Sequence, residues 1–234
     1  MFASAYLRDV SVNGRRRHHR RHGSRRTQEE RRNATQARIL DATAEALADL
    51  GWAGLSTTEV SRRAGVSRGA QQHHYPTKMA LVAAALEHLL GRLRREYEEA
   101  FAALPDEWRD VDGALDLFWE MLRQPPAMAL LELALAGRTD DTLRGLSADL
   151  NERVVVIIKE VFHELFPETL PPELVDTTIR SLFALLVGLS IQNSLDDDVH
   201  GHQAAVMSQV KLLAQLLISE EKEPRHDQTP RPVG

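Results

Sequence analysis

The 234-residue chain contains no cysteine, and aromatic residues make up only 5% of it. The absence of cysteine excludes disulfides, thiolate metal sites and a cysteine nucleophile. The sequence also lacks an uninterrupted run of about eighteen apolar residues, so we expect no membrane span. Residues 1–14 do not show the basic-then-apolar order of a secretory signal. A cytoplasmic location fits these absences.

Motifs typical of enzymes are missing as well. The sequence contains no G-x-S-x-G nucleophile elbow, no G-x-x-x-x-G-K-[ST] phosphate loop and no H-E-x-x-H zinc motif. His200 and His202 follow three aspartates, but a polar run between two helices is more often a solvated loop than a metal site. We therefore expect no enzyme, no cofactor and no metal site.

Charge is distributed unevenly along the chain. The formal net charge is −5, although residues 1–38 contain eleven Arg against three acidic residues, a net charge of +8. Residues 39–78 are balanced, so residues 79–234 carry −13. A basic head on an acidic body suggests that the head contacts phosphate while the body has another role.

The basic segment, residues 1–32, is rich in Arg and poor in apolar residues. It cannot bury enough apolar surface to offset its conformational entropy, so we expect a disordered arm. Such arms contact phosphates and enter narrow minor grooves, which favours a DNA-binding arm. The alternative is a solvated segment that adds only non-specific affinity. Residues 221–234 are expected to form a disordered tail.

Residues 56–78, STTEVSRRAGVSRGAQQHHYPTK, predict two short helices joined by a tight turn. Ser56 and Glu59 have the spacing of a capping box, in which the hydroxyl caps the first turn and the carboxylate reaches back. Gly65 stands where a turn requires positive φ. Two short helices with a glycine turn are typical of a helix-turn-helix, whose second helix lies in the major groove of DNA.

The second short helix has a start and a stop signal of its own. Ser67 offers an N-cap, and the helix is expected to end near His74 because Pro76 disfavours its continuation. Residues 34–50 form an amphipathic helix that Gly51 ends. These three helices make a unit of roughly the size that binds DNA alone.

The three-helix unit resembles a known family. The order helix, GWAGLSTTEVSRRAGVSRGAQQHHYPTK, long helix is similar to the amino-terminal domain of the tetracycline-repressor (TetR) family of bacterial transcriptional regulators. The resemblance covers about residues 34–80 and rests on Gly51-Trp52, Ser56/Thr57, Ala64-Gly65-Val66-Ser67, Gly69, His74, Tyr75 and Lys78. It implies an all-α fold, with a helix-turn-helix DNA-binding domain over 33–78 and a helical ligand-binding and dimerisation domain over 79–220.

The resemblance also implies a set of DNA contacts. Thr57 and Lys78 should each meet a phosphate at the start of a helix, and Arg68 should read the guanine edge. Two adjacent His on a helix point about 100° apart, so a metal site there is disfavoured. The full set of implied DNA-binding residues is Thr57, Arg68, Gly69, Gln72, His73, His74 and Lys78.

Two glutamines depart from the family pattern. The family usually has an apolar residue at the position of Gln71 and a Tyr at that of Gln72. Because Gln can pair with the adenine edge, Gln72 is expected to face DNA. For Gln71, a solvated side chain or a local hydrogen bond is expected, and Tyr75 is expected to pack in the core.

The rest of the chain is expected to be helical. The run VVVII at residues 154–158 would suggest a strand by itself, but its helical flanks favour a helix. The expected helices cover residues 78–103, 111–123, 126–137, 141–166, 172–194 and 202–220.

The resemblance implies a ligand pocket among the middle helices and a homodimer through the last two. Glu132 lies in an otherwise apolar helix, so it either faces solvent or orients a ligand. The helix over 172–194 is apolar nearly all round and must be covered, by a second copy or within one subunit. The implied ligand-binding residues are Phe101, Phe118, Trp119, Leu122, Met128, Glu132 and Phe162, although such side chains are more often plain core.

Together these features predict a DNA-binding regulator. We expect a homodimeric repressor that an unknown small hydrophobic ligand releases from a palindromic operator, with an activator role left open. The alternative is an Arg-rich nucleoid-associated or RNA-binding protein that ignores sequence.

Overall fold

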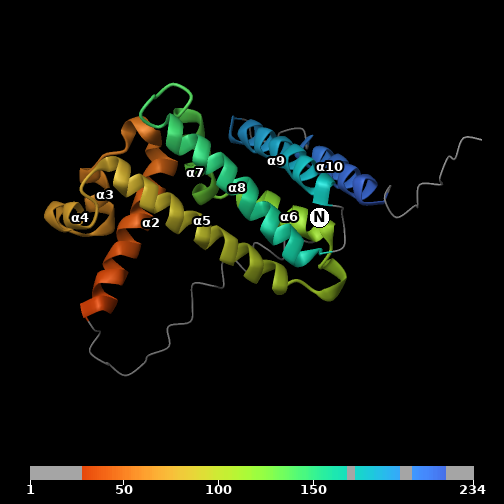
Figure 1. Cartoon of the computed structure of the whole chain (residues 1–234), viewed down its shortest axis with the longest axis horizontal. Coiled ribbons are helices and arrows are strands. Elements are labelled where there is room, and N and C mark those ends of the chain that lie inside the picture. The colour runs from red at the N-terminus through yellow and green to blue at the C-terminus, as the bar shows by residue number, and fades with distance from the viewer. Residues whose placement is uncertain (1–27, 168–171, 196–201, 220–234) are drawn as a thin grey trace, which may run out of the picture. The chain divides into compact units, whose positions relative to one another are not determined.

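The computed structural model describes residues 28–167, 172–195 and 202–219, and within these ranges the chain is all-helical (Figure 1). The all-α expectation is confirmed. The helices are α2 (Gln28–Gly54), α3 (Thr57–Ala64), α4 (Arg68–His74), α5 (Lys78–Ala102), α6 (Val111–Leu122), α7 (Pro125–Ala136), α8 (Arg144–Leu165), α9 (Pro172–Leu195) and α10 (His202–Ser219), with a 3-10 turn at Asp106–Trp108. The chain forms two compact units, one up to Ile158 and one from Lys159.

The first helix begins earlier than its apolar pattern indicates. α2 starts at Gln28 and not at residue 34, so the last residues of the segment expected to be a disordered arm, 28–32, are helical. Gln, Glu and Arg are good helix formers. Glu29 and Glu30 lie in the first turn, where negative charge interacts favourably with the helix dipole and stabilises the helix. Residues 1–27 and 220–234, which hold the rest of the arm and the tail, lie outside the described residues.

The core of the first unit forms where α2 packs against α3, α5 and α7. Helical spacing on each of these elements places apolar side chains inward. Asp41 of α2 adds a polar tie to α5, because its Oδ1 lies 2.9 Å from His88 Nε2 and 2.8 Å from Arg92 Nη1. The largest fully buried core residues of this unit are Ile39, Leu47, Val60, Leu81, Val82, Leu89, Leu133 and Leu143.

Gly51 bends the end of α2. Its backbone has φ 63° and ψ −177°, a left-handed φ that favours glycine. The regular helix therefore ends at Gly51 as expected, and one further turn leads through Gly54 to the buried Leu55. This bend directs the chain into α3.

The VVVII stretch is helical, as its flanks predict. Val155 is buried at 2% exposure while its neighbour Val156 is 37% exposed, and both lie within α8. The β-branched run is thus accommodated because the residues on both sides propagate the helix.

The second unit contains the packed pair α9 and α10. Its buried side chains include Leu186 and Leu189 on α9 and Val210 and Ala214 on α10. A second set of apolar residues is exposed, and we call it the apolar face: Leu185 and Leu195 on α9, and Val206, Leu212, Leu213 and Leu216 on α10.

Helix α9 is long and apolar enough over Val175–Leu195 to cross a membrane, by length and composition only. The sequence contains no uninterrupted apolar run there because Asp176 and Arg180 lie in the first turns. Asp176 accepts from Lys159 Nζ (2.7 Å) and from Arg180 Nε (2.8 Å), so this end of the helix carries paired charges.

Candidate nucleic-acid interface

Two serine caps and one glycine fix the backbone of α3 and α4. The Oγ atoms of Ser56 and Ser67 accept from the amides of Glu59 and Ala70, both at 3.2 Å. Gly65 adopts φ 63° and ψ 39°, and its N–H points back to the last turn of α3. The predicted helix-turn-helix is confirmed, and each of its signals acts over only a few residues.

The second half of the expected capping box is wrong. The Glu59 carboxylate does not reach back to Ser56 but accepts from Arg62 (2.6 Å) and Arg63 (2.8 Å). These two hydrogen bonds lower the pKa of Glu59 to about 2. Arg63 also donates to Asp49 of α2 at 2.5 Å. The charged side chains of α3 therefore pair with one another and with α2, and the Arg63–Asp49 pair joins α3 to α2.

Helix α4 presents a polar surface to solvent. Arg68, Gly69, Gln72 and His73 are all exposed, and they come from two successive turns of one short helix. A Cβ placed on Gly69 would meet no atom within 4 Å, so the backbone there is open to close approach. Thr57, in the first turn of α3, is half-buried.

Gln71 makes the local hydrogen bond that its position predicts. It is 3% exposed, and its Nε2 donates to the backbone oxygen of Tyr75 at 3.1 Å. A polar residue thus occupies an inward position because the amide satisfies a carbonyl at the end of the helix. Tyr75 packs against the core, as expected, and burial raises its pKa.

His74 lies at the edge of the exposed face. It is half-buried, and its ring centroid lies 5.8 Å from that of His73. Burial lowers its pKa, with smaller contributions from His73 and from Arg32 of α2. Arg32 is therefore close enough to add positive charge at the end of the recognition helix.

Lys78 does not extend from the surface. Its Nζ donates to the backbone oxygen of Trp52 at 3.0 Å and lies 3.6 Å from the centroid of the Trp52 ring. Burial lowers the pKa of the ammonium, while Asp140 raises it. The resemblance assigns Lys78 to a phosphate, whereas in the structure its ammonium is held by the backbone oxygen and the ring of Trp52.

The implied ligand-binding residues are scattered through the core. Phe101 and Trp119 are buried, and Phe118 stacks edge-on against Tyr97 with 6.4 Å between centroids. Glu132 is half-buried, with its Oε2 3.3 Å from the position of a Cβ on Gly51. Leu122 and Met128 are half-buried in α6 and α7, and Phe162 contacts Phe166 in the second unit.

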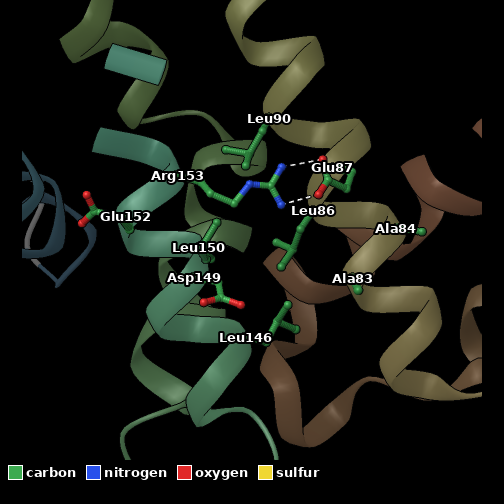
Figure 2. Close-up of a pocket in the computed structure, with 10 residues that line it drawn as sticks. All are labelled: Ala83, Ala84, Leu86, Glu87, Leu90, Leu146, Asp149, Leu150, Glu152 and Arg153. Carbon is green, nitrogen blue, oxygen red and sulfur yellow. Dashed lines mark hydrogen bonds and ion pairs between the residues drawn. The ribbon is translucent and has the colours of Figure 1, made fainter. Parts of the chain in front are cut away.

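A cavity of about 460 Å³ lies between α5 and α8. Its inner wall is apolar and includes Leu86, Leu90 and Leu150. Figure 2 shows Arg153 of α8 reaching across this space to Glu87 of α5, with which it forms a two-pronged ion pair. None of the implied ligand-binding residues lines this cavity. The charged pair was not predicted, because 66 residues separate its partners.

Comparison with known proteins identifies the family that the chain resembles. Residues 39–85 match the family model of bacterial regulatory proteins, tetR family. Over these residues the chain is similar to the TetR family. This is a family of regulators and not of enzymes. The HTH-type transcriptional regulator CymR of Pseudomonas putida is 36% identical over 120 residues, which is 51% of this chain and 59% of CymR. The chain spans about three fifths of the length of the curated relatives it matches.

Solved structures show that the TetR-like fold extends beyond the matched domain. A protein of Rhodococcus sp. assigned to the TetR family has a TM-score of 0.63 at 24% identity, covering 80% of this chain and 100% of that one. The multidrug binding protein EbrR, solved in complex with imidazole, has a TM-score of 0.52 at 26% identity, covering 88% and 97%.

Proposed function

We propose that this chain is a sequence-specific DNA-binding transcriptional regulator that acts as a homodimer on a palindromic operator. The observation that carries the proposal is the exposed polar face of α4, in a chain similar to TetR-family regulators, where Ser56 and Ser67 cap α3 and α4 and Gly65 makes the turn between them. A recognition helix must present hydrogen-bonding groups to base edges and phosphates, and α4 does so.

The exposed side chains have the chemistry that base reading requires. Arg68 stands at the start of α4, where a guanidinium can pair with guanine O6 and N7. Gln72, one turn later, can pair with adenine N6 and N7. His73 and His74 follow Gln72 on α4, and Thr57 lies in the first turn of α3. These three residues suit phosphate contacts, for which α3 also offers its first-turn amides.

The apolar face of α9 and α10 favours a second copy of the chain as its partner. Leu212, Leu213 and Leu216 are 46–50% exposed, and a soluble monomer rarely leaves such residues together in water. The adjoining exposed positions on α9 include Ala184 and Gly188, and small residues allow two helices to approach closely. A two-fold dimer would also pair the two recognition helices, as palindromic half-sites demand.

We further propose that a small ligand releases the protein from DNA, so that it acts as a repressor in the cytoplasm. The cavity between α5 and α8 supports a ligand in this unit, since it combines an apolar wall with a charged rim. The similarity to a multidrug binding protein supports ligand binding in general. Release requires that the ligand bind the DNA-incompetent state more tightly than the competent one. The side chains implied by the resemblance remain a second prediction for the ligand site.

Selection of bound DNA from a random duplex pool tests the proposal. At about 150 mM salt non-specific contacts are weakened, and we expect enrichment of a palindrome with two half-sites. Enrichment of no sequence, with binding that vanishes as salt rises, would contradict the proposal. That result would favour the alternative, a non-specific nucleoid-associated or RNA-binding protein.

A further inference from the structure

Trp52 stands where three segments of the first unit meet. It follows the bend at Gly51, and its indole Nε1 donates to Asp140 Oδ2 in the loop between α7 and α8, at 2.7 Å. Its backbone oxygen accepts from Lys78 at the start of α5, at 3.0 Å. The same ammonium lies over its ring, 3.6 Å from the centroid. One residue thus joins the end of α2 to two segments that are distant in sequence.

The carboxylate of Asp140, which accepts the hydrogen bond from Trp52, is held in place by Thr142. Asp140 Oδ1 accepts from the Thr142 amide at 2.9 Å and from its hydroxyl at 2.5 Å. Hydrogen bonds from Thr142 and Trp52 lower the pKa of Asp140, so the carboxylate is ionised at neutral pH. It offers Trp52 a charged acceptor, and charge-assisted hydrogen bonds are stronger than neutral ones.

The backbone at Gly51 allows Trp52 to reach this position. Gly51 has φ 63°, and a Cβ there would lie 3.3 Å from Glu132 Oε2 on α7. The left-handed φ of the bend therefore favours glycine, and the Glu132 carboxylate would have to shift slightly to make room for a Cβ. The indole ring also partly shields the Lys78 ammonium, which agrees with the lowered pKa that burial gives this side chain.

These contacts suggest that Lys78 supports DNA binding indirectly. We infer that Trp52, Lys78 and Asp140 form a clasp that positions the helix-turn-helix, and that Lys78 acts on DNA through Trp52 and not by contacting a phosphate. The inference rests on the proposed DNA-binding function. All three are positioning residues, because they hold the end of α2 from which α3 and α4 follow.

The salt dependence of operator binding separates the two roles of Lys78. Dissociation constants are measured between about 50 and 250 mM salt on the selected duplex and on a scrambled duplex, for the full chain and for Lys78→Met, Trp52→Phe and the double variant. Removing one phosphate contact reduces the magnitude of the negative slope of log Kobs against log salt by about 0.9 and weakens binding to both duplexes alike.

The clasp predicts a different pattern. Lys78→Met weakens operator binding about tenfold at an unchanged salt slope, and affinity for the scrambled duplex changes little. Trp52→Phe, which keeps an aromatic ring and leaves Lys78 in place, weakens operator binding in the same way. The double variant loses less than the product of the single losses, because both changes open one clasp. Thermal unfolding of each variant establishes that the protein is folded.

Three outcomes overturn the inference. A salt slope whose magnitude falls by about 0.9 in Lys78→Met, with no effect of Trp52→Phe, makes Lys78 a phosphate contact. Operator binding that neither substitution changes leaves the clasp without a role in DNA binding. In both cases the proposed function stands. If the unaltered chain selects no duplex, the proposed function and the clasp fail together.

Discussion

The helix-turn-helix and the terminal helix pair expose opposite chemistry. Helix α4 places Arg68, Gln72 and His73 in solvent, whereas α9 and α10 place leucines there. A surface that reads nucleic acid must keep hydrogen-bonding groups available, while an exposed apolar surface is stabilised only when another surface covers it. This contrast is why we propose different partners for the two regions: DNA for the first and a second copy of the chain for the second.

The two regions also differ in what determines their conformation. Ser56, Gly65 and Ser67 set the backbone of α3 and α4 through contacts within a few residues. The α9–α10 pair depends instead on packing between the two helices, whose buried side chains include Leu186 and Val210. Local signals therefore suffice to define the first region, and the second requires packing.

The largest expected effect comes from making the apolar face polar. Leu213→Glu combined with Leu216→Glu should separate the dimer, because covering charged carboxylates with apolar side chains is strongly unfavourable. A monomer binds only one half-site, so operator affinity should fall by at least about a hundredfold. Sedimentation gives the oligomeric state, and equilibrium binding gives the affinity.

The matched control for this change is Ala148→Glu, which adds a carboxylate at an exposed position of α8 in the first unit. It should leave both the sedimentation and the affinity unchanged. If the double glutamate variant sediments and binds DNA like the unaltered chain, the apolar face is not the dimer interface.

The second prediction concerns the polar face. Arg68→Ala should weaken each half-site by about 1–3 kcal/mol and remove the preference at one base pair, because a bidentate contact to guanine is lost. Competition binding with all four bases at each operator position measures this. Arg144→Ala removes an exposed guanidinium from α8, where it pairs with Asp141, and should have no effect. If both variants lose the same operator affinity, Arg68 contributes only non-specific positive charge and does not read a base.

The third prediction concerns the bend that leads into the helix-turn-helix. Gly51→Ala should destabilise the fold by about 1–2 kcal/mol, because an alanine at φ 63° is strained and its Cβ meets Glu132. Urea unfolding measures the change. Gly145→Ala, at a helical position with open space, should be neutral or slightly stabilising. Similar results for both glycines would mean that the bend is not a constraint.

The smallest effect is a pH dependence at His74. Burial lowers its pKa in the free protein, so the ring is neutral at pH 7. Nearby phosphates favour the protonated form, and binding would then take up a proton. Operator affinity should therefore rise as pH falls from about 8 to 6, by at most about tenfold per pH unit for one proton. His74→Gln should show a flatter profile over the same range, and an identical profile would place His74 away from the phosphates.

The free protein should respond to pH in the opposite direction. Because the folded pKa of His74 lies below the unfolded value, the unfolded chain binds more protons as pH falls below about 6.5. The contribution of His74 to stability is present above that range and is lost on acidification. Urea unfolding of the DNA-free protein at several pH values measures this loss, which His74→Gln should reduce.

The sequence predicted the elements whose signals are local. Ser67 and Gly65 act on adjacent backbone groups, so α4 and the turn before it could be placed without tertiary information. The flanks of VVVII were likewise sufficient to identify α8. Of the two alternatives expected for Gln71, the local hydrogen bond is confirmed, since its bond to Tyr75 spans only one turn, whereas the solvated side chain is wrong because Gln71 is buried.

Contacts between distant residues could not be predicted. Trp52 and Asp140 are 88 residues apart and Lys78 lies 26 residues from Trp52, so no spacing rule brings them together. For Glu59 the competing partners were near in sequence, but the choice of Arg62 and Arg63 over Ser56 depends on side-chain geometry. The cavity between α5 and α8 depends on how two helices that are distant in sequence lie against each other, which periodicity does not encode.

The most direct test of a dimer that places two recognition helices in successive major grooves is the spacing of the half-sites. Affinity is measured for the selected operator and for a version with about 5 base pairs, half a helical turn, inserted between the half-sites. The account predicts a loss of at least about a hundredfold, because the second half-site moves to the opposite face of the duplex. Unchanged affinity after the insertion would contradict it.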